Sequence, residues 1–326
     1  MTGFLVRRLL WAIFLFVVAT MVTYLIFFII PGDPALIAVG SGATETPQFL
    51  AHVRHELNLD LPIYQQYWLF VWNIVRHGSL GYSFVNGTSV RWIVAQDAPV
   101  TASLILGGAV LWLGISIPVG ILSALRPRSL TDRFAMILVL IGISAPTFWT
   151  GLILAYVFGF KLGWTPIAGY CNFFPSHKAG VCAGPDQWAY HLILPWLTFT
   201  FLFAALYTRL VRATVLETMS EDYVRTARAK GASGARLLVQ HVLRNSMLPL
   251  ITILGMDLGL AIGAAVFIEM VFNLPGLGQE MVGASTSDNL PVVVGIVLVA
   301  TAAVIVFNFL VDVAYAWLDP RIRLEN

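Results

Sequence analysis

Residues 220–249 read SEDYVRTARAKGASGARLLVQHVLRNSMLP, a polar and basic segment between two long apolar runs. Ser220 is a residue type that caps helices, and Glu221 and Asp222 put negative charge into a first helical turn. Gly231 is a typical stop signal, so we predict a helix of about ten residues that ends there.

A second helix is predicted after this glycine. Ser233 can cap it, and apolar residues continue the pattern from Leu237 toward Pro249. The segment therefore predicts a helix, a tight glycine turn and another helix. An exposed turn of this kind is a natural docking surface for a soluble partner.

The composition indicates a polytopic membrane protein. The chain has 326 residues, of which 58% are hydrophobic and only 11% are charged. Its mean hydropathy of +0.82 lies well above that of soluble globular domains. No basic tail suggests nucleic acid as a partner.

Six apolar stretches are long enough to cross a hydrocarbon core of about 30 Å. A first stretch with Arg7 and Arg8 ahead of it resembles a signal peptide, but its uncharged run is too long and no small-residue cleavage site follows. We therefore predict an all-α membrane domain over residues 1–326 with spans at roughly 9–30, 100–124, 134–160, 188–208, 248–272 and 290–317.

The basic residues predict the orientation of these spans. Placing both termini inside puts 14 of the 19 Lys and Arg residues on the cytoplasmic side, as the positive-inside rule requires. The same choice places residues 220–249 in the cytoplasm. The five basic residues left outside are Arg54, Arg76, Arg91, Lys161 and Lys178.

Residues 31–97 form a predicted extracytoplasmic helical insertion. One helix opens at Thr46 and Pro47, and a second amphipathic helix follows Pro62 with Trp68 and Trp72 beside its apolar face. This insertion either lies on the membrane surface as a lid or serves as a platform for an external partner.

Prolines interrupt two of the predicted spans. Pro118 lies in the second and Pro146 in the third. Each removes one backbone hydrogen bond and is expected to kink its helix. Such a kink either shapes the bundle or serves a moving pathway, and we include Pro146 among the candidate pathway residues.

The only two cysteines, Cys171 and Cys182, lie in a predicted outer loop. On the oxidising side of a membrane they favour a disulfide, with two free thiols as the alternative. Metal binding is less favoured, because His177 between them does not complete a structural zinc set. We predict no metal site.

Small residues line the fifth span, with Gly255, Gly259 and Gly263 at four-residue spacing. This spacing lets another helix approach closely. Asp257 lies beside the stripe, and an acid at such depth either lines a pathway or makes a structural hydrogen bond. Glu269, near the outer end, is expected to reach the membrane interface.

The common catalytic motifs that would indicate an enzyme are absent from the sequence. The sequence lacks a phosphate-binding loop, an H-E-x-x-H zinc motif, a G-x-S-x-G elbow and a Cys/His cluster. We predict no catalytic residues, and the chain does not hydrolyse ATP unaided.

The chain resembles the permease subunits of binding-protein-dependent ABC importers. In the family loop pattern E-A-A-x-x-x-G only Ala227 and Gly231 match literally, yet D-Y-V-R-T-A-R-A-K-G is the form of the dipeptide and oligopeptide branch. The resemblance covers nearly the whole chain. Further matching motifs are R-R-L-L at Arg7, P-G-D-P at Pro31, L-x-L-D-x-P at Leu57, S-x-P-T-F at Ser144, H-x-I-L-P at His191, V-F-I-E at Val266, P-G-L-G at Pro275 and D-P-R at Asp319.

The resemblance implies a half-transporter in a bacterial or archaeal cytoplasmic membrane. It pairs with a second homologous permease, receives peptides from an extracytoplasmic solute-binding protein, and docks two cytoplasmic ATPase subunits that bind ATP and magnesium. The resemblance implies no cofactor in the chain itself. The implied coupling helix comprises Glu221, Asp222, Tyr223, Arg225, Thr226, Ala227, Arg228, Ala229, Lys230 and Gly231.

Three other interpretations stay open at this point. The same architecture imports nickel, glutathione or oligosaccharides in relatives of this branch. A secondary transporter or channel needs no ATPase, but normally shows internal repeats, which we do not find in six unequal spans. A sensor or scaffold would use residues 220–249 to dock a signalling protein.

Overall fold

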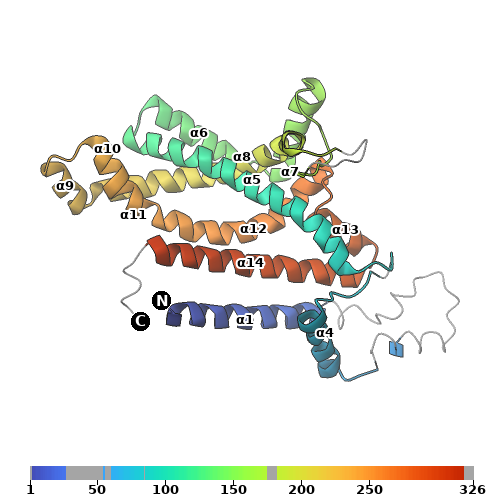
Figure 1. The fold of residues 1–326 in the computed structure, drawn as a ribbon. Helices are drawn as coiled ribbons and strands as arrows, with labels where there is room; N and C mark the ends of the chain where they lie inside the picture. Colours follow the sequence, from blue (N-terminus) through green and yellow to red (C-terminus); the bar gives the residue numbers. More distant parts are fainter. Residues whose placement is uncertain (1, 27–53, 56–59, 84, 175–181, 319–326) are drawn as a thin grey trace. The chain divides into compact units, whose positions relative to one another are not determined.

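The computed structural model describes residues 2–26, 54–55, 60–83, 85–174 and 182–318, and these are almost entirely helical (Figure 1). Residues 31–53 and Leu57 fall outside the described residues, as do His177 and Asp319, so the helix predicted at Thr46 lies there too. In chain order the elements are α1 (Thr2–Tyr24), α4 (Ile63–His77), α5 (Val90–Leu125), α6 (Leu130–Ser144), α7 (Thr147–Leu154), a π-helical segment (Ala155–Lys161), α8 (Pro185–Ser220), α9 (Asp222–Ala229), α10 (Gly234–Leu237), a second π-helical segment (Leu238–Leu243), α11 (Arg244–Ser246), α12 (Leu248–Phe272), α13 (Leu277–Thr286) and α14 (Leu290–Leu318).

Among the described residues, five helices are long and apolar enough to cross a membrane. The count becomes six when the bent pair Leu130–Ser144 and Thr147–Lys161 is taken as one span, which agrees with the predicted number. The helix that contains the second predicted span is longer than the span itself, because α5 begins at Val90, before the apolar stretch predicted at roughly 100–124.

The third span is broken rather than kinked. α6 and α7 meet at an angle of 108°. Ala145 adopts an extended backbone, and Pro146 stands at the N-cap of α7. The residue before a proline avoids the helical conformation, and the proline itself has no N–H to donate, so the two helices separate here. Pro118, by contrast, lies within an uninterrupted α5.

The described residues divide into two compact units, and α5 and α14 contribute to both. Unit 1 lies within Met1–Val100 and Gly276–Val306. Its apolar core joins the start of α5 to α13 and α14, with Val90, Val292 and Ile296 at its centre. A buried hydrogen bond of 2.7 Å from Asn289 Nδ2 to Ser83 Oγ fixes the loop before α5.

In unit 1, α4 is the predicted amphipathic helix after Pro62. Its inner face contacts the end of α1: the Tyr24 hydroxyl donates to Gln66 Oε1 at 3.0 Å, and the Thr20 and Tyr67 hydroxyls lie 2.9 Å apart. Trp68 and Trp72 on the other side are exposed. None of the residues in α4 is fully buried, so its contact with α1 covers only part of its inner face.

Unit 2 lies within Thr101–Pro275 and Phe307–Asn326, and α8 is its central helix. Trp112 from α5 is fully buried against Phe199, Phe203 and Tyr207 of α8. Dispersion and close packing hold membrane helices together, because lipid offers no hydrophobic gain for association. This aromatic cluster therefore stabilises the α5–α8 contact.

Glycines bring α5 and α6 against α8 along its length. A Cβ atom at Gly120 would lie 2.7 Å from Val211 Cβ, and one at Gly142 would lie 2.6 Å from the Phe201 carbonyl oxygen. No side chain fits at either position, since real Cβ contacts this short do not occur. α5, α6 and α8 thus form a tightly packed three-helix body.

Candidate functional site

The segment after α8 folds as the predicted helix, glycine turn and helix. α9 covers Asp222–Ala229. The predicted Ser220 cap is wrong: Ser220 is the last residue of α8 and its hydroxyl donates to the Glu217 carbonyl at 2.7 Å. Glu221 takes the N-cap position with an extended backbone and makes no side-chain cap bond. α8 continues further than the cap pattern suggests, and one residue separates it from α9.

Gly231 ends α9 in a left-handed conformation with φ of 82°. The Gly231 N–H donates to Arg228 and the Ala232 N–H donates to the Ala227 carbonyl at 3.2 Å, which satisfies the last carbonyls of the helix. A β-carbon disfavours this backbone conformation, so glycine is needed for the turn. The predicted stop signal is confirmed.

The second limb returns along α10, the π-helical segment Leu238–Leu243 and α11. Ser233 stands at the N-cap of α10 as predicted, although its side chain makes no cap bond. Tyr223 connects the two limbs: its hydroxyl accepts from Asn245 Nδ2 at 2.7 Å and donates to the His241 carbonyl at 3.4 Å. Val224 beside it is only 1% exposed and anchors α9 to unit 2.

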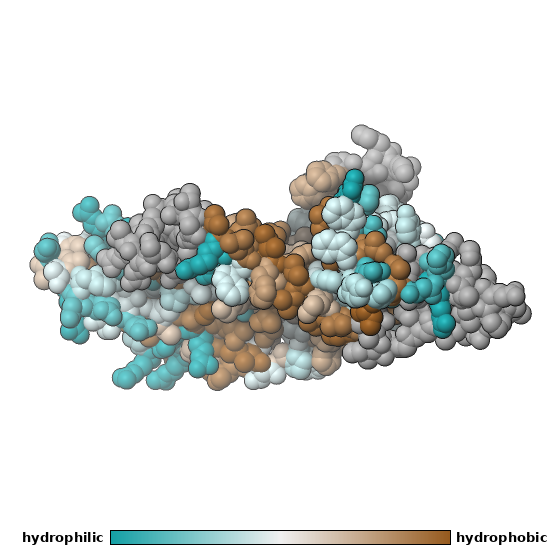
Figure 2. Space-filling model, turned by 90° about the horizontal axis from the view of Figure 1, so that it is seen from below, coloured by the Kyte–Doolittle hydropathy of each residue, from teal (hydrophilic) through white to brown (hydrophobic). Residues whose placement is uncertain are grey.

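The rest of α9 faces outward. Arg225 makes an exposed pair with Asp222 at 3.5 Å, while neither Arg228 nor Lys230 has an acidic partner within the part of the chain that the structure describes. Figure 2 shows hydrophilic residues gathered over the end of the molecule that carries α9 and α10. Ala227 is half-buried, and the other small residue, Ala229, is exposed. α9 and its C-cap Lys230 thus expose more cationic than acidic side chains, with small residues among them.

A buried ion pair near this segment was not predicted. Asp132, in the first turn of α6, is 4% exposed and accepts from Arg212 of α8 at 2.7 Å (Nε) and 2.9 Å (Nη2). The Ser123 hydroxyl at the end of α5 and the Arg128 backbone N–H, at 2.8 Å, donate to the same carboxylate. Four donors, from α5, the turn after it and α8, therefore meet on one buried carboxylate.

The predicted pathway residues of α12 differ in their surroundings. Gly255 is buried against Val311, with room for a Cβ only at 3.1 Å, so α12 and α14 approach closely there. Gly259 is half-buried, whereas Gly263 is exposed with open space around it. Asp257 is half-buried and interacts with the Tyr207 hydroxyl of α8, though no hydrogen bond of ordinary geometry joins them.

Pro146 lies apart from that stripe. It lines an open apolar cavity of about 570 Å³ at the break between α6 and α7, together with Leu140, Phe148 and Trp149. No residue of α12 lines this cavity. The structure therefore does not gather all predicted pathway residues at one place.

Glu269 does not reach the surface, and this corrects the expectation that it extends to the interface. It is 0% exposed, and the Thr101 hydroxyl donates to Glu269 Oε1 at 2.6 Å. Its position near the end of an apolar helix suggested exposure. The part of α5 that belongs to unit 2, which includes Thr101, instead contacts it.

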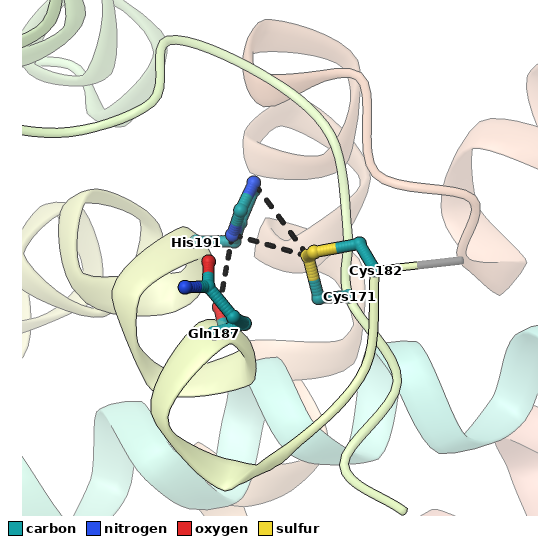
Figure 3. Close-up of a disulfide and its surroundings, with 4 residues drawn as sticks. All are labelled: Cys171, Cys182, Gln187 and His191. Carbon is teal, nitrogen blue, oxygen red and sulfur yellow. Dashed lines mark hydrogen bonds between the residues drawn. A yellow bond between two sulfur atoms is a disulfide. The ribbon is translucent and has the colours of Figure 1, made fainter. Parts of the chain in front are cut away.

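Cys171 and Cys182 form a disulfide in the loop before α8 (Figure 3). His191 of α8 lies beside it, with Nδ1 3.2 Å from Cys171 Sγ and 2.9 Å from the Gln187 carbonyl. Both sulfur atoms and the imidazole are close enough to share a metal ion only if the disulfide is reduced. As a disulfide, the pair closes the loop instead.

The five to six candidate spans among the described residues define a multi-pass helical membrane protein. Residues 116–324 match the family model described as the binding-protein-dependent transport system inner membrane component. Residues 1–105 match the N-terminal model of the same membrane components. The chain therefore belongs to the family of binding-protein-dependent transport system inner membrane components, as its motifs indicated.

Relatives match over their full length. The chain is 38% identical to the di/tripeptide transport system permease protein of Pseudomonas aeruginosa, with 100% of each chain covered. It is 36% identical to a Brucella abortus protein named a peptide transport system permease, again with 100% of each covered. A Brucella ovis protein named a peptide permease is 37% identical, with 99% of this chain and 100% of that protein covered.

Proposed function

We propose that this chain forms half of the pathway of an ATP-driven importer for peptides. It would pair with a second homologous permease and accept peptides from an extracytoplasmic binding protein. Two cytoplasmic ATPase subunits, which bind ATP and magnesium, would drive it. The names of the full-length relatives support peptides as the substrate. Cytoplasmic termini are supported by the distribution of Lys and Arg: this orientation places 14 of the 19 on the inside, and the inverted orientation would place those 14 outside.

We assign the docking of an ATPase subunit to residues 221–231, which comprise α9, its N-cap Glu221 and the turn to Gly231. The observation that carries this assignment is a helix that is held in place on its inner side and exposes cations without acidic partners among the described residues on its outer side. The burial of Val224 and the Tyr223–Asn245 hydrogen bond hold α9 in place. Of the acidic residues that the structure describes, none forms a salt bridge with Arg228 or Lys230. Acidic groups in a groove of the ATPase would form salt bridges with these cations.

The coupling itself is mechanical. ATP binding draws the two ATPases together, and each carries its docked α9 with it. A helix that contacts the open and closed ATPase pairs differently transfers that free-energy difference to the permease helices. Asp257 and the Gly255 to Gly263 stripe remain our proposal for part of the pathway that these helices open.

Site-specific crosslinking tests the assignment. The two native cysteines form a disulfide, so Thr226→Cys, on the exposed face of α9, can be labelled with a thiol-directed photocrosslinker in the intact complex. We expect a crosslink to an ATPase subunit. The matched control is Lys161→Cys, an exposed position predicted on the outer side, which should give none. Failure of the α9 position, or equal products from both positions, would overturn the assignment.

The turn at Gly231 gives a second expected result. Its φ of 82° strains any residue with a β-carbon, although no atom lies within 4 Å of the place a Cβ would take. Gly231→Val should therefore destabilise the folded turn after α9 by about 1–2 kcal/mol, through backbone strain alone. We expect peptide uptake to fall as a result. Gly231→Asn is the matched control, because asparagine tolerates this conformation. Equal uptake by both variants in proteoliposomes would contradict the need for the turn.

A further inference from the structure

The Asp132–Arg212 ion pair occupies a joint between three helices. Ser123 belongs to the last turn of α5, Asp132 to the first turn of α6, and Arg212 to α8. The Ser129 hydroxyl caps α6 by accepting from the Asp132 N–H at 3.2 Å, which orients the start of the helix. Arg128, in the turn, has a positive φ of 63° and donates its N–H to the Asp132 carboxylate. The carboxylate thus closes the α5–α6 hairpin and binds it to α8.

The geometry of this pair is that of a rigid connection. Arg212 donates through two nitrogens to the two oxygens of one carboxylate, an arrangement that fixes direction as well as distance. Asp132 is almost fully buried, and 26% of the Arg212 side chain is exposed. A buried pair adds little net stability over an apolar one, so stability alone does not account for it. Its value here lies in position rather than in stability.

Arg212 stands two turns before the end of α8, close to α9. α8 runs without a break to Ser220, and only Glu221 separates it from α9. Val224 of α9 is buried, and α9 contacts both α8 and α10. A displacement of α9 is therefore delivered first to the last turns of α8. Without a connection at Arg212, those turns could bend while the α5–α6 hairpin stayed behind.

We propose that Asp132 and Arg212 are positioning residues for coupling: they make the α5–α6 hairpin move with α8 when an ATPase displaces α9. Gly142 brings α6 close to α8 at Phe201, farther from α9, and Gly120 brings α5 close to α8 at Val211, next to Arg212. The ion pair adds the polar connection of α6 to α8 at this end. This inference rests on the proposed docking of an ATPase at α9.

The main test measures peptides imported per ATP hydrolysed by the complete importer in proteoliposomes. Asp132→Asn and Arg212→Gln should assemble and hydrolyse ATP, but import about tenfold fewer peptides per ATP. Arg212→Lys keeps the charge and loses the two-pronged geometry, so it should fall between these variants and the wild type. The matched control is Arg133→Gln, which removes an exposed neighbouring cation and should stay within about twofold of wild type.

A merely structural role would lower the amount of folded complex and leave peptides per ATP unchanged. Ratios within about twofold of wild type for Asp132→Asn and Arg212→Gln would therefore overturn the proposal.

A distance measurement on the full chain alone separates this inference from the proposed function. Spin labels at Leu130→Cys and Glu217→Cys, both exposed, report the hairpin and the end of α8. We expect one narrow distance distribution that broadens in Asp132→Asn. An unchanged distribution in Asp132→Asn would overturn the connection, whatever the importer does. Absence of ATP-driven peptide uptake by the wild type would instead overturn the proposed function.

Discussion

Val224→Asp is expected to detach α9 and abolish assembly with the ATPase subunits. Val224 is 1% exposed in α9, so the substitution removes an apolar anchor worth about 1.5–3 kcal/mol. It also places a carboxylate without a partner in an apolar contact, which adds several kcal/mol. α9 has eight residues, and isolated helices shorter than about 12 residues are marginal in water. The helix therefore has too little stability of its own to compensate for both losses.

Trypsin provides the measurement. α9 carries Arg225 and Arg228, and the folded helix protects the bonds that follow them. We expect rapid cleavage there in Val224→Asp and loss of copurifying ATPase subunits. Val239→Asp is the matched control, because Val239 lies in the same loop and is 61% exposed. Its cleavage should equal that of wild type, and equal protection of both variants would show that Val224 does not anchor the helix.

The short-range signals in residues 220–249 predicted most of the loop. Gly231 was identified as the end of a helix because a left-handed residue is a local property, and local properties are visible in sequence. Ser220 was misassigned for the opposite reason. Serine is compatible with a cap, but whether α8 ends before it or at it depends on the packing of α8 against the rest of unit 2, which no local pattern records.

The Asp132–Arg212 pair could not be predicted from the chain alone. The two residues are 80 positions apart, and each has an ordinary local explanation. Arg212 counts toward the positive-inside excess, and Asp132 follows a serine as a typical first-turn acid. Only the packing of α6 on α8 shows that they meet. The convergence of four hydrogen-bond donors on one carboxylate depends on tertiary packing, which local sequence patterns do not record.

Glu269 and the break at Pro146 show the same limit. Depth in a span can be counted from the sequence, but the direction in which a side chain points cannot, so the enclosure of Glu269 was missed. The sequence predicted an effect of Pro146 and underestimated its size. The two helices that it separates both pack against α8, and only α7 also packs against α12, so the size of the 108° bend depends on contacts that the sequence does not record.

Gly142→Ala is expected to destabilise the permease by overpacking, by about 1–3 kcal/mol. The added Cβ would lie 2.6 Å from the Phe201 carbonyl oxygen and 2.8 Å from Ala205 Cβ. The first neighbour is backbone, so it cannot rotate away, and α6 must move off α8. Thermal unfolding in detergent, followed by circular dichroism, measures the loss. We expect a lower midpoint together with weaker peptide uptake, because the three-helix body would loosen.

Gly114→Ala is the control that decides the cause. Gly114 lies in α5 and is exposed, and no atom lies within 4 Å of the place its Cβ would take. Alanine is favoured over glycine inside a helix by about 0.5–1 kcal/mol, so this variant should match or exceed the wild-type midpoint. Opposite signs for the same substitution isolate the contact with Phe201 from helix propensity. If Gly142→Ala unfolds at or above the wild-type midpoint, α6 and α8 are not in the close contact that carries the Asp132–Arg212 connection.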